Sequence, residues 1–271
     1  MYQEKHFDLV RHASIVPVSG KLLIMNRFRH QLSFLSWVLF WLWRLSGNRF
    51  EAPFQLKNGS IVFLRSNPLN DIATATEVFA EELYDIPLAI KPASIRLIVD
   101  LGANVGYSCV YWLYKFPQAK IIAFEPHPVH VRQLRRHLEA NSGGDRVLLI
   151  PKAAGTENGE LYLTDDEASS ELVNIPIEGA MKVDVVDWIK EIENYVIDLL
   201  KIDIEGSEYT LLADERFAQL NVRVCVLEWH SRETIADGRA WCEERLVHLG
   251  YQVCEGKGSS LMTGLLWAWK R

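Results

Sequence analysis

The most chemically distinctive segment of the chain is the run DLGANVGYS, from Asp100 to Ser108, which follows the apolar run 95–99. Its glycines permit a tight turn and a close approach of the backbone to a ligand. The run lacks the dinucleotide fingerprint GxGxxG, and its leading acid would repel a pyrophosphate but could hold an ammonium group. The motif therefore favours a cationic ligand, such as the amino-acid end of S-adenosylmethionine. A tight turn that binds nothing is the alternative.

Two more candidate positions follow the next apolar runs. Glu125, in EPHP, ends the run 120–124 about 20 residues beyond the glycine turn, where an acid accepts hydrogen bonds from ribose hydroxyls. NAD sites use the same arrangement, so Glu125 indicates a nucleoside without specifying which one. The segment PKAAG, which includes Ala153, follows the run 147–150, and its small residues could flank an adenine ring. An ordinary loop explains that segment equally well.

A third group of polar residues surrounds the apolar runs 197–202 and 222–227. The segment KIDIEGSE places Lys201, Asp203 and Glu205 on one side of an extended chain. One of these carboxylates could take a proton from a substrate hydroxyl, and two could hold a divalent cation, which is the minor alternative. A capped helix start with a salt bridge to Lys201 is the structural alternative. Glu228 and His230 face the same way, and His230 is a candidate base because imidazole titrates near neutrality.

These residues can meet only if strands and helices alternate along the chain. Apolar runs predict strands, and apolar periodicity predicts helices between them. The strands are expected at 95–99, 120–124, 147–150, 197–202, 222–227, 251–254 and 265–269, and the helices at 107–115, 128–140, 187–192, 207–220 and 234–249. This alternation predicts βαβ units and a doubly wound, mostly parallel α/β sheet. Ligands bind such sheets outside the carboxyl ends of the strands, where the polar residues fall.

Two regions are expected ahead of this alternation. Residues 1–50 are predicted to be a helical extension that ends at the breaker cluster Ser46-Gly47-Asn48. Residues 51–94 are predicted to hold a hairpin, with strands 54–56 and 61–64 joined through Asn58-Gly59, and a helix at 73–84. The binding domain then spans 95–271, and its loop 156–181 is expected to contribute to a pocket for a second substrate.

Composition limits the classes of function. The chain has 271 residues and a net charge of −6, which argues against a nucleic-acid binder that relies on positive charge. Its 4 cysteines form no CxxC pair and no metal-ligand spacing. We therefore expect buried thiols in a reducing compartment, the cytoplasm, and no secretory signal.

The run LSFLSWVLFWLWRL, from Leu32 to Leu45, is the most apolar part of the chain. It falls short of the roughly 20 residues that cross a bilayer. Its tryptophans and a basic border suit a helix that lies in a membrane interface, with arginines at Arg27, Arg29, Arg44 and Arg49. The favoured interpretation is a helix docked on the domain or on a second subunit, because short apolar runs are more often buried.

The motifs DLGANVGYS, AFEPHP, LLKIDIEGSEYTLL and VLEWH together resemble the FkbM family of S-adenosylmethionine-dependent methyltransferases in their order and spacing. The resemblance extends from about Arg65 to Tyr251. Upstream, the family's lead-in pattern is matched by Arg65, Asp71, Glu77 and Tyr84. The segment VDVVDW, at 183–188, departs from the pattern, since the family more commonly has T-L-D there. The first 50 residues match nothing in the family.

The resemblance implies a class I methyltransferase fold, a Rossmann-like sheet of seven strands whose last strand is antiparallel. It also implies methyl transfer from S-adenosylmethionine to a hydroxyl of a sugar, a glycan or a secondary metabolite. The expected cofactor-binding residues are Asp100, Gly102, Ala103, Asn104, Gly106, Tyr107, Ser108, Glu125, Pro126, Ala153 and Asp203. The expected catalytic residues are Lys201, Asp203, Glu205 and His230, with Asp203 the first choice of base and His230 the second. The expected acceptor-binding residues are Glu205, Glu208 and Glu228. No metal ligand is assigned.

Two other functions would use some of the same features. A NAD(P)-dependent oxidoreductase would share the sheet and the ribose acid, but the turn lacks GxGxxG. A non-catalytic binding protein on a methyltransferase fold would have no reason to keep so many carboxylates together. The expected partner is a small-molecule or glycan acceptor and not a nucleic acid. Peripheral membrane contact through residues 32–45 and a homodimer stay open.

Overall fold

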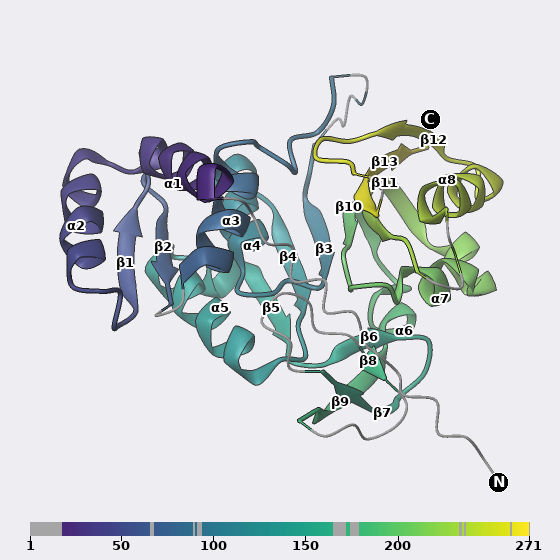
Figure 1. The fold of residues 1–271 in the computed structure, drawn as a ribbon. Coiled ribbons are helices and arrows are strands. Elements are labelled where there is room, and N and C mark those ends of the chain that lie inside the picture. The colour runs from purple at the N-terminus through teal and green to yellow at the C-terminus, as the bar shows by residue number, and fades with distance from the viewer. Residues whose placement is uncertain are drawn as a thin grey trace, which may run out of the picture.

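The computed structural model describes residues 18–65, 68–88, 90, 94–164, 172–173, 179–232, 235, 237–260 and 262–270. Figure 1 shows an N-terminal unit of helices and a hairpin beside a central sheet, with a small second sheet at one end. Within these described residues, the central sheet has seven strands. These strands are β3 (Leu97–Leu101), β4 (Lys120–Phe124), β5 (Val147–Ile150), β10 (Val196–Ile202), β11 (Asn221–His230), β12 (Gln252–Glu255) and β13 (Thr263–Trp269).

The order of the strands in the central sheet is β12-β13-β11-β10-β3-β4-β5. Strands β11, β10, β3, β4 and β5 pair in parallel, whereas β13 runs antiparallel to both β11 and β12. This topology confirms the predicted class, a Rossmann-like α/β sheet with an antiparallel last strand. In the sheet, β4 lies on one side of β3 and β10 lies on the other side. The order thus reverses between β3 and β10, which is where open α/β sheets bind ligands.

Helices cover both faces of the sheet and divide its side chains between two cores. In β3, Ile98 belongs to the core on one face and Val99 to the core on the other, because successive side chains of a strand point to opposite sides. The helices on the Ile98 side are α3 (Pro68–Phe79), α4 (Tyr107–Lys115) and α5 (Pro128–Ala140). Those on the Val99 side are α6 (Trp188–Ile192), α7 (Glu208–Ala213) and α8 (Gly238–His248). Two short 3₁₀ helices are η1 (Gly144–Arg146) and η2 (Glu215–Gln219).

The N-terminal unit contains the expected helices and hairpin. Its elements are α1 (Val18–Gln31), α2 (Phe34–Leu45), β1 (Ala52–Gln55) and β2 (Ile61–Leu64). The two strands pair antiparallel through the predicted turn, where Gly59 has a φ of +90°. Helix α1 packs on α3, which joins the unit to the rest of the molecule. Among the residues that the structure describes, no helix has both the length and the apolarity to cross a bilayer.

Side chains of α5 and of the residue after it close the outer edge of β2. Asn141 accepts a hydrogen bond from the N–H of Ile61 and donates one to its carbonyl oxygen, both at 2.8 Å. His137 accepts one from the N–H of Phe63 at 2.8 Å. These side chains satisfy backbone groups that an edge strand otherwise leaves open.

Several predicted elements need correction. The segment expected as a loop over 156–181 contains strands of a second, four-stranded sheet, β6-β9-β7-β8. Its strands are β6 (Ala153–Gly155), β7 (Gly159–Leu163), β8 (Leu172–Val173) and β9 (Met181–Asp187). The acids at 165–167 in the same segment lie outside the described residues. The helix expected over 207–220 is split into α7 and η2 at Asp214, whose backbone is extended (ψ 120°) and whose side chain caps η2.

Candidate active site

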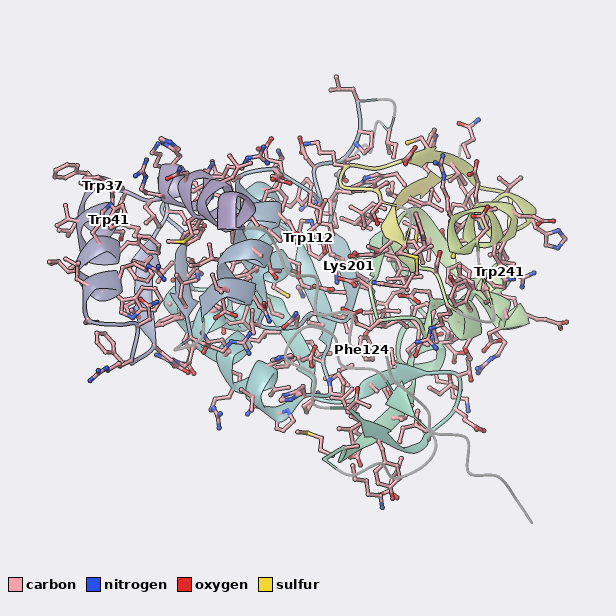
Figure 2. The ribbon with its side chains drawn as sticks, in the orientation of Figure 1. Trp37, Trp41, Trp112, Phe124, Lys201 and Trp241 are labelled. Atoms are coloured by element: carbon pink, nitrogen blue, oxygen red, sulfur yellow. The ribbon has the colours of Figure 1, made fainter. Side chains whose placement is uncertain are left out.

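The predicted polar residues meet at the carboxyl ends of β4, β3, β10 and β11, which are neighbours in the sheet. Two of the expected strands are longer than predicted at this edge. Strand β3 extends through Asp100 to Leu101, and β11 extends to His230, so Asp100, Glu228 and His230 lie within strands and not after them. Figure 2 shows Lys201, at the end of β10, near the middle of the molecule.

The turn after β3 requires both of its outer glycines. Gly102 has a φ of +87°, and a Cβ there would lie 1.8 Å from the carbonyl oxygen of Asp203. Gly106 has a φ of +93°, and a Cβ there would lie 2.8 Å from the Cγ of Leu134 on α5. The turn therefore packs directly on the end of β10. Helix α4 then begins at Tyr107 without a side-chain cap, so its first backbone N–H groups lie beside the turn.

Glu125, directly after β4, holds the tip of this turn. One carboxylate oxygen accepts a hydrogen bond from the N–H of Asn104, and the other accepts one from the N–H of His127, each at 2.8 Å. Asn104 has a φ of +50°, a left-handed conformation that Asn adopts more readily than most residues. A carboxylate offers about four acceptor positions, so Glu125 has capacity for further donors. Its role as a ribose ligand stays a prediction.

Lys201 is a buried cation beneath the turn. Its Nζ lies 3.1 Å from Asp100 Oδ1 and 3.0 Å from Asp203 Oδ2, and it donates to the carbonyl oxygen of Gly102 at 2.8 Å. Burial alone would lower the pKa of Lys201, but the carboxylates of Asp100 and Asp203 outweigh it and raise that pKa well above its usual value. Lys201 therefore stays charged. These contacts fit a residue that positions Asp100, Asp203 and the glycine turn.

Asp100 lies below the turn and not on its surface. Ser108 donates to Asp100 Oδ2 at 2.6 Å, and Lys201 occupies Oδ1. The side chain is fully buried. Asp100 therefore supports a ligand through the turn that it anchors, and the direct contact with an ammonium group expected from the sequence is not available to it in this arrangement.

Tyr107 also differs from its predicted role. Its hydroxyl donates to the carbonyl oxygen of Phe63 at 3.0 Å, and its ring centroid lies 5.1 Å from that of His137. The side chain thus joins α4 to the hairpin and is not directed at the turn. Ala103 and Ala153 are buried, and Ala153 pairs with Val185 in the second sheet.

Tyr84 and Arg232 contact the site, although the sequence motifs alone did not assign them to it. The Tyr84 hydroxyl donates to Asp203 Oδ2 at 3.4 Å, and its ring centroid lies 5.7 Å from Lys201 Nζ. Arg232 donates to the carbonyl oxygen of Glu205 at 2.9 Å. A Cβ at Gly206 would lie 2.0 Å from the Arg232 guanidinium, so the glycine is a sequence signal of this packing.

His230 is held by a buried acid. Its Nδ1 lies 2.8 Å from Glu208 Oε1, which also accepts a hydrogen bond from the N–H of Gly206. Its Nε2 lies 3.5 Å from Glu205 Oε2 and 3.9 Å from Glu228 Oε1. Burial opposes the imidazolium, but the bond to Glu208 and the surrounding carboxylates prevail and raise the pKa of His230 to about 9. His230 is therefore a cation near neutral pH and a poor proton acceptor there, contrary to its predicted second rank as base.

Glu228 is a partly exposed carboxyl group whose pKa is raised. Burial, and after it the charge of Asp203, raise the pKa of Glu228 to about 8. Thr263 donates to its Oε1 at 3.1 Å, and a quarter of the side chain (25%) is exposed. The sequence predicts that Glu228 binds the acceptor. The structure adds a pKa that could support proton transfer near neutral pH.

Asp203, Glu228 and His230 bring three potential ligand atoms together. One such atom from each lies within 4.8 Å of the other two. Two carboxylates and an imidazole form a donor set that divalent cations accept. No metal ligand is predicted from the sequence, so this grouping appears only in the structure. The minor alternative, a divalent cation, stays a prediction.

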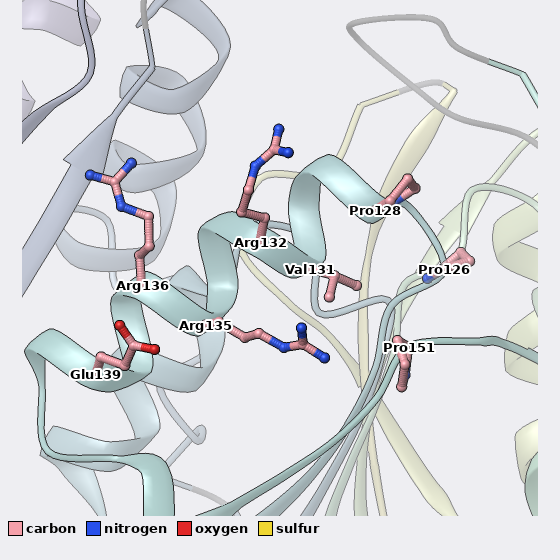
Figure 3. Close-up of a pocket in the computed structure, with 8 residues that line it drawn as sticks. All are labelled: Pro126, Pro128, Val131, Arg132, Arg135, Arg136, Glu139 and Pro151. Atoms are coloured by element: carbon pink, nitrogen blue, oxygen red, sulfur yellow. The ribbon is translucent and has the colours of Figure 1, made fainter.

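A surface pocket of about 540 Å³ lies beside α5, beyond Glu125. Figure 3 shows three arginines extending from α5, Arg132, Arg135 and Arg136, with Arg135 directed toward Pro151. Of the predicted site residues, Pro126 alone lines it. The full lining is Pro126, Pro128, Val131, Arg132, Arg135, Arg136, Glu139 and Pro151.

Comparison with known proteins gives a consistent result. The sequence matches the methyltransferase FkbM domain over residues 100–253, more than half of the chain. Methyltransferase sdnD of Sordaria araneosa is 32% identical over 193 residues, which cover 56% of this chain and 73% of the relative. The 2-O-methyltransferase NoeI of Sinorhizobium fredii is 25% identical over 170 residues, which cover 55% and 68%. Among solved structures, M. jannaschii TYW2 in complex with AdoMet is similar with a TM-score of 0.45 and 13% identity, over 81% of this chain and 84% of that one.

Proposed function

This chain belongs to the FkbM family of methyltransferases, and we propose that it transfers the methyl group of S-adenosylmethionine to a hydroxyl oxygen of a sugar, a glycan or a small metabolite. The observation that carries the proposal is the position of Glu228, a carboxyl group with a pKa raised to about 8, at the same sheet edge as the glycine turn. The relative named as a 2-O-methyltransferase supports oxygen as the methylated atom. Family membership decides against the NAD(P)-dependent oxidoreductase.

The residues of the turn fit S-adenosylmethionine. The uncapped start of α4 offers backbone N–H groups that suit the carboxylate of an amino acid. Glu125 has acceptor capacity for ribose hydroxyls. Asp203, whose side chain is 22% exposed, supplies negative charge where the cationic end would lie. S-adenosylmethionine brings a methyl group that is already electrophilic, so the protein has chiefly to orient the acceptor oxygen.

Glu228 is the proposed acceptor of the hydroxyl proton. Thr263 holds one carboxylate oxygen, which leaves Oε2 for the acceptor hydroxyl. A pKa of about 8 makes Glu228 a stronger base than an ordinary carboxylate, and the carboxyl becomes ionised at mildly alkaline pH. Asp203, the first choice from the sequence, is instead engaged by the ammonium of Lys201 and the hydroxyl of Tyr84 through the same oxygen, Oδ2.

His230 and Glu205 have supporting roles in this proposal. The imidazolium of His230, fixed by Glu208, favours the ionised form of Glu228 and keeps it near the end of β10. Glu205 accepts a hydrogen bond from Arg232 at its backbone carbonyl, and its carboxylate lies 3.5 Å from the imidazole Nε2, so it helps to hold His230 in place.

The test combines binding with turnover. Calorimetric titration with S-adenosylhomocysteine should give equal affinity for the wild type and Glu228→Gln, and weaker affinity for Glu125→Ala. With radiolabelled S-adenosylmethionine and a panel of methyl glycosides and hydroxylated metabolites, Glu228→Gln should lower the turnover by about 100-fold or more. The matched control is Glu160→Gln, at an exposed acid of β7, which should change neither the affinity for S-adenosylhomocysteine nor the turnover.

Three outcomes would contradict the proposal. The cofactor assignment fails if S-adenosylhomocysteine does not bind and NAD does. The assignment of oxygen fails if the methyl group is recovered on nitrogen or carbon of the product. The role of Glu228 fails if Glu228→Gln retains full turnover with an acceptor that the wild type methylates.

A further inference from the structure

Helix α2 presents an apolar face that nothing in the described part of the chain covers. Its residues Phe34, Leu35, Leu42 and Leu45 are 57–82% exposed. They fall on one side of the helix because residues three or four positions apart are neighbours. Trp37 and Trp41 border this face, and Figure 2 shows both on the outer side of the N-terminal unit. Neighbouring exposed apolar side chains of this kind are candidates for an interaction site.

The opposite side of α2 fixes the helix firmly to the hairpin. Phe40 and Trp43 are buried against Phe54 of β1, with ring centroids 5.6 Å and 5.4 Å from the Phe54 ring. Ser36, also buried, accepts a hydrogen bond from the N–H of Gln55 at 2.7 Å. The exposed face is therefore part of the folded surface, because the helix that carries it is packed on the hairpin.

The charge around α2 has the sign that an anionic surface requires. Residues 18–60 contain six lysines and arginines and one glutamate, which gives a net charge of +5. Since the whole chain has a net charge of −6, the remaining residues together carry −11. Arg44 lies in the last turn of α2 and Arg49 soon after it, so positive charge borders the apolar face directly. The single acid of this segment, Glu51, is already paired with Arg136.

We propose that α2 lies in the surface of an anionic lipid bilayer, with Phe34, Leu35, Leu42 and Leu45 in the acyl boundary and Trp37 and Trp41 at headgroup level. A helix in that position combines buried apolar area with attraction of basic residues to acidic lipids. A second copy of the chain is a less favourable partner for this face, because pairing two such faces would bring together two segments that each carry a net charge of +5. The proposal is independent of the methylation chemistry.

The test uses the full chain and two kinds of vesicle. The protein should cosediment with phosphatidylcholine vesicles that contain phosphatidylserine and much less with phosphatidylcholine alone. Leu42→Gln should lower the partition coefficient by about tenfold or more, because one buried leucine is lost from the bilayer. Arg49→Gln should lower it by about fivefold. Val247→Gln, at an exposed valine of α8, is the matched control and should leave binding unchanged.

A contact measurement separates direct insertion from indirect effects. Brominated phosphatidylcholine in the anionic vesicles should quench tryptophan fluorescence, and the double variant Trp37→Phe/Trp41→Phe should remove most of that quenching. The melting temperature of each variant, measured without lipid, shows that it is folded. The proposal is wrong if the folded wild type does not bind anionic vesicles. It is also wrong if light scattering shows a dimer that Leu42→Gln converts to a monomer, since α2 would then be a subunit interface.

Discussion

The ammonium of Lys201 and the carboxylate of Asp100 form a buried ion pair, 3.1 Å apart, between residues that are 101 positions apart in the chain. The pair joins β10 to β3 at the sheet edge where the family's motifs converge. Through the bond of Lys201 to the Gly102 carbonyl and its contact with Asp203, it also fixes the glycine turn to the end of β10. The Lys201 ammonium thus holds the two carboxylates and the turn together at this end of the sheet.

Lys201→Met is expected to destabilise the fold by about 3–5 kcal/mol, because it leaves the buried carboxylate of Asp100 without its counter-ion. Urea unfolding followed by circular dichroism measures the change. Lys182→Met removes an exposed lysine that pairs with Glu160 and should leave the free energy of unfolding nearly unchanged. Equal effects of the two substitutions would show that the buried pair adds nothing to stability.

Gly102→Ala is expected to damage both stability and cofactor binding. Gly59 has nearly the same φ and open space around it, so Gly59→Ala is a matched control for backbone strain alone. Both variants should lose about 1–2 kcal/mol from the left-handed conformation. Gly102→Ala should lose about 1–3 kcal/mol more, because its Cβ would meet the carbonyl of Asp203. Urea unfolding and titration with S-adenosylhomocysteine separate the two effects. Equal losses in the two alanine variants would mean that the turn can move away from β10.

The turnover rate is expected to rise with pH through about 8, because Glu228 must be ionised to accept a proton. Since the charge of His230 lowers the pKa of Glu228, His230→Gln should move this rise to higher pH. Initial rates between pH 6 and 10, with saturating cofactor, give both profiles. A rise at the same pH in both proteins would show that Glu228 does not titrate in the profile.

Stability is expected to fall as the pH drops below neutrality because of His137. Burial lowers the pKa of His137 to about 4, from 6.5, so the unfolded chain binds more protons between these values. The contribution is fully present above about pH 6.5 and is lost as the pH falls toward 4, with a total on the order of 3 kcal/mol. Urea unfolding at pH 7, 6 and 5 checks this. His137→Gln should show a smaller slope with pH, and an unchanged slope would assign the loss to other groups.

Much of the central fold could be predicted because its patterns are local. Strand β4, helix α5 and strand β5 occupy the predicted residues, since each is a short apolar run or one amphipathic face bounded by turn residues. The second sheet could not be predicted in the same way. Its strand β8 has two residues, and β6 pairs with β9 across a long separation, so neither produces a periodic signal.

The sequence predicted which residues lie at the candidate site, but it did not predict what each of them contacts there. The motifs identified Asp100, Lys201 and Glu228 as residues of one sheet edge. Their roles depend on how deeply each side chain is buried, and the alternation of side chains along a strand does not reveal this. Asp100 proves to be fully buried, whereas Glu228 remains partly exposed with a raised pKa. The contact of Tyr84 with Asp203 joins residues 119 positions apart, and no local pattern predicts it.

The closure of β2 by α5 has a consequence for the order in which the protein is made. Ile61 and Phe63 leave the ribosome before their partners, which come 80 and 74 residues later. Until α5 has been synthesised, the new chain carries both an open strand edge and the apolar α2, a combination that favours aggregation and chaperone binding. Substitutions at Asn141 should therefore appear first as a lower yield of soluble protein, even though this residue lies outside the candidate active site.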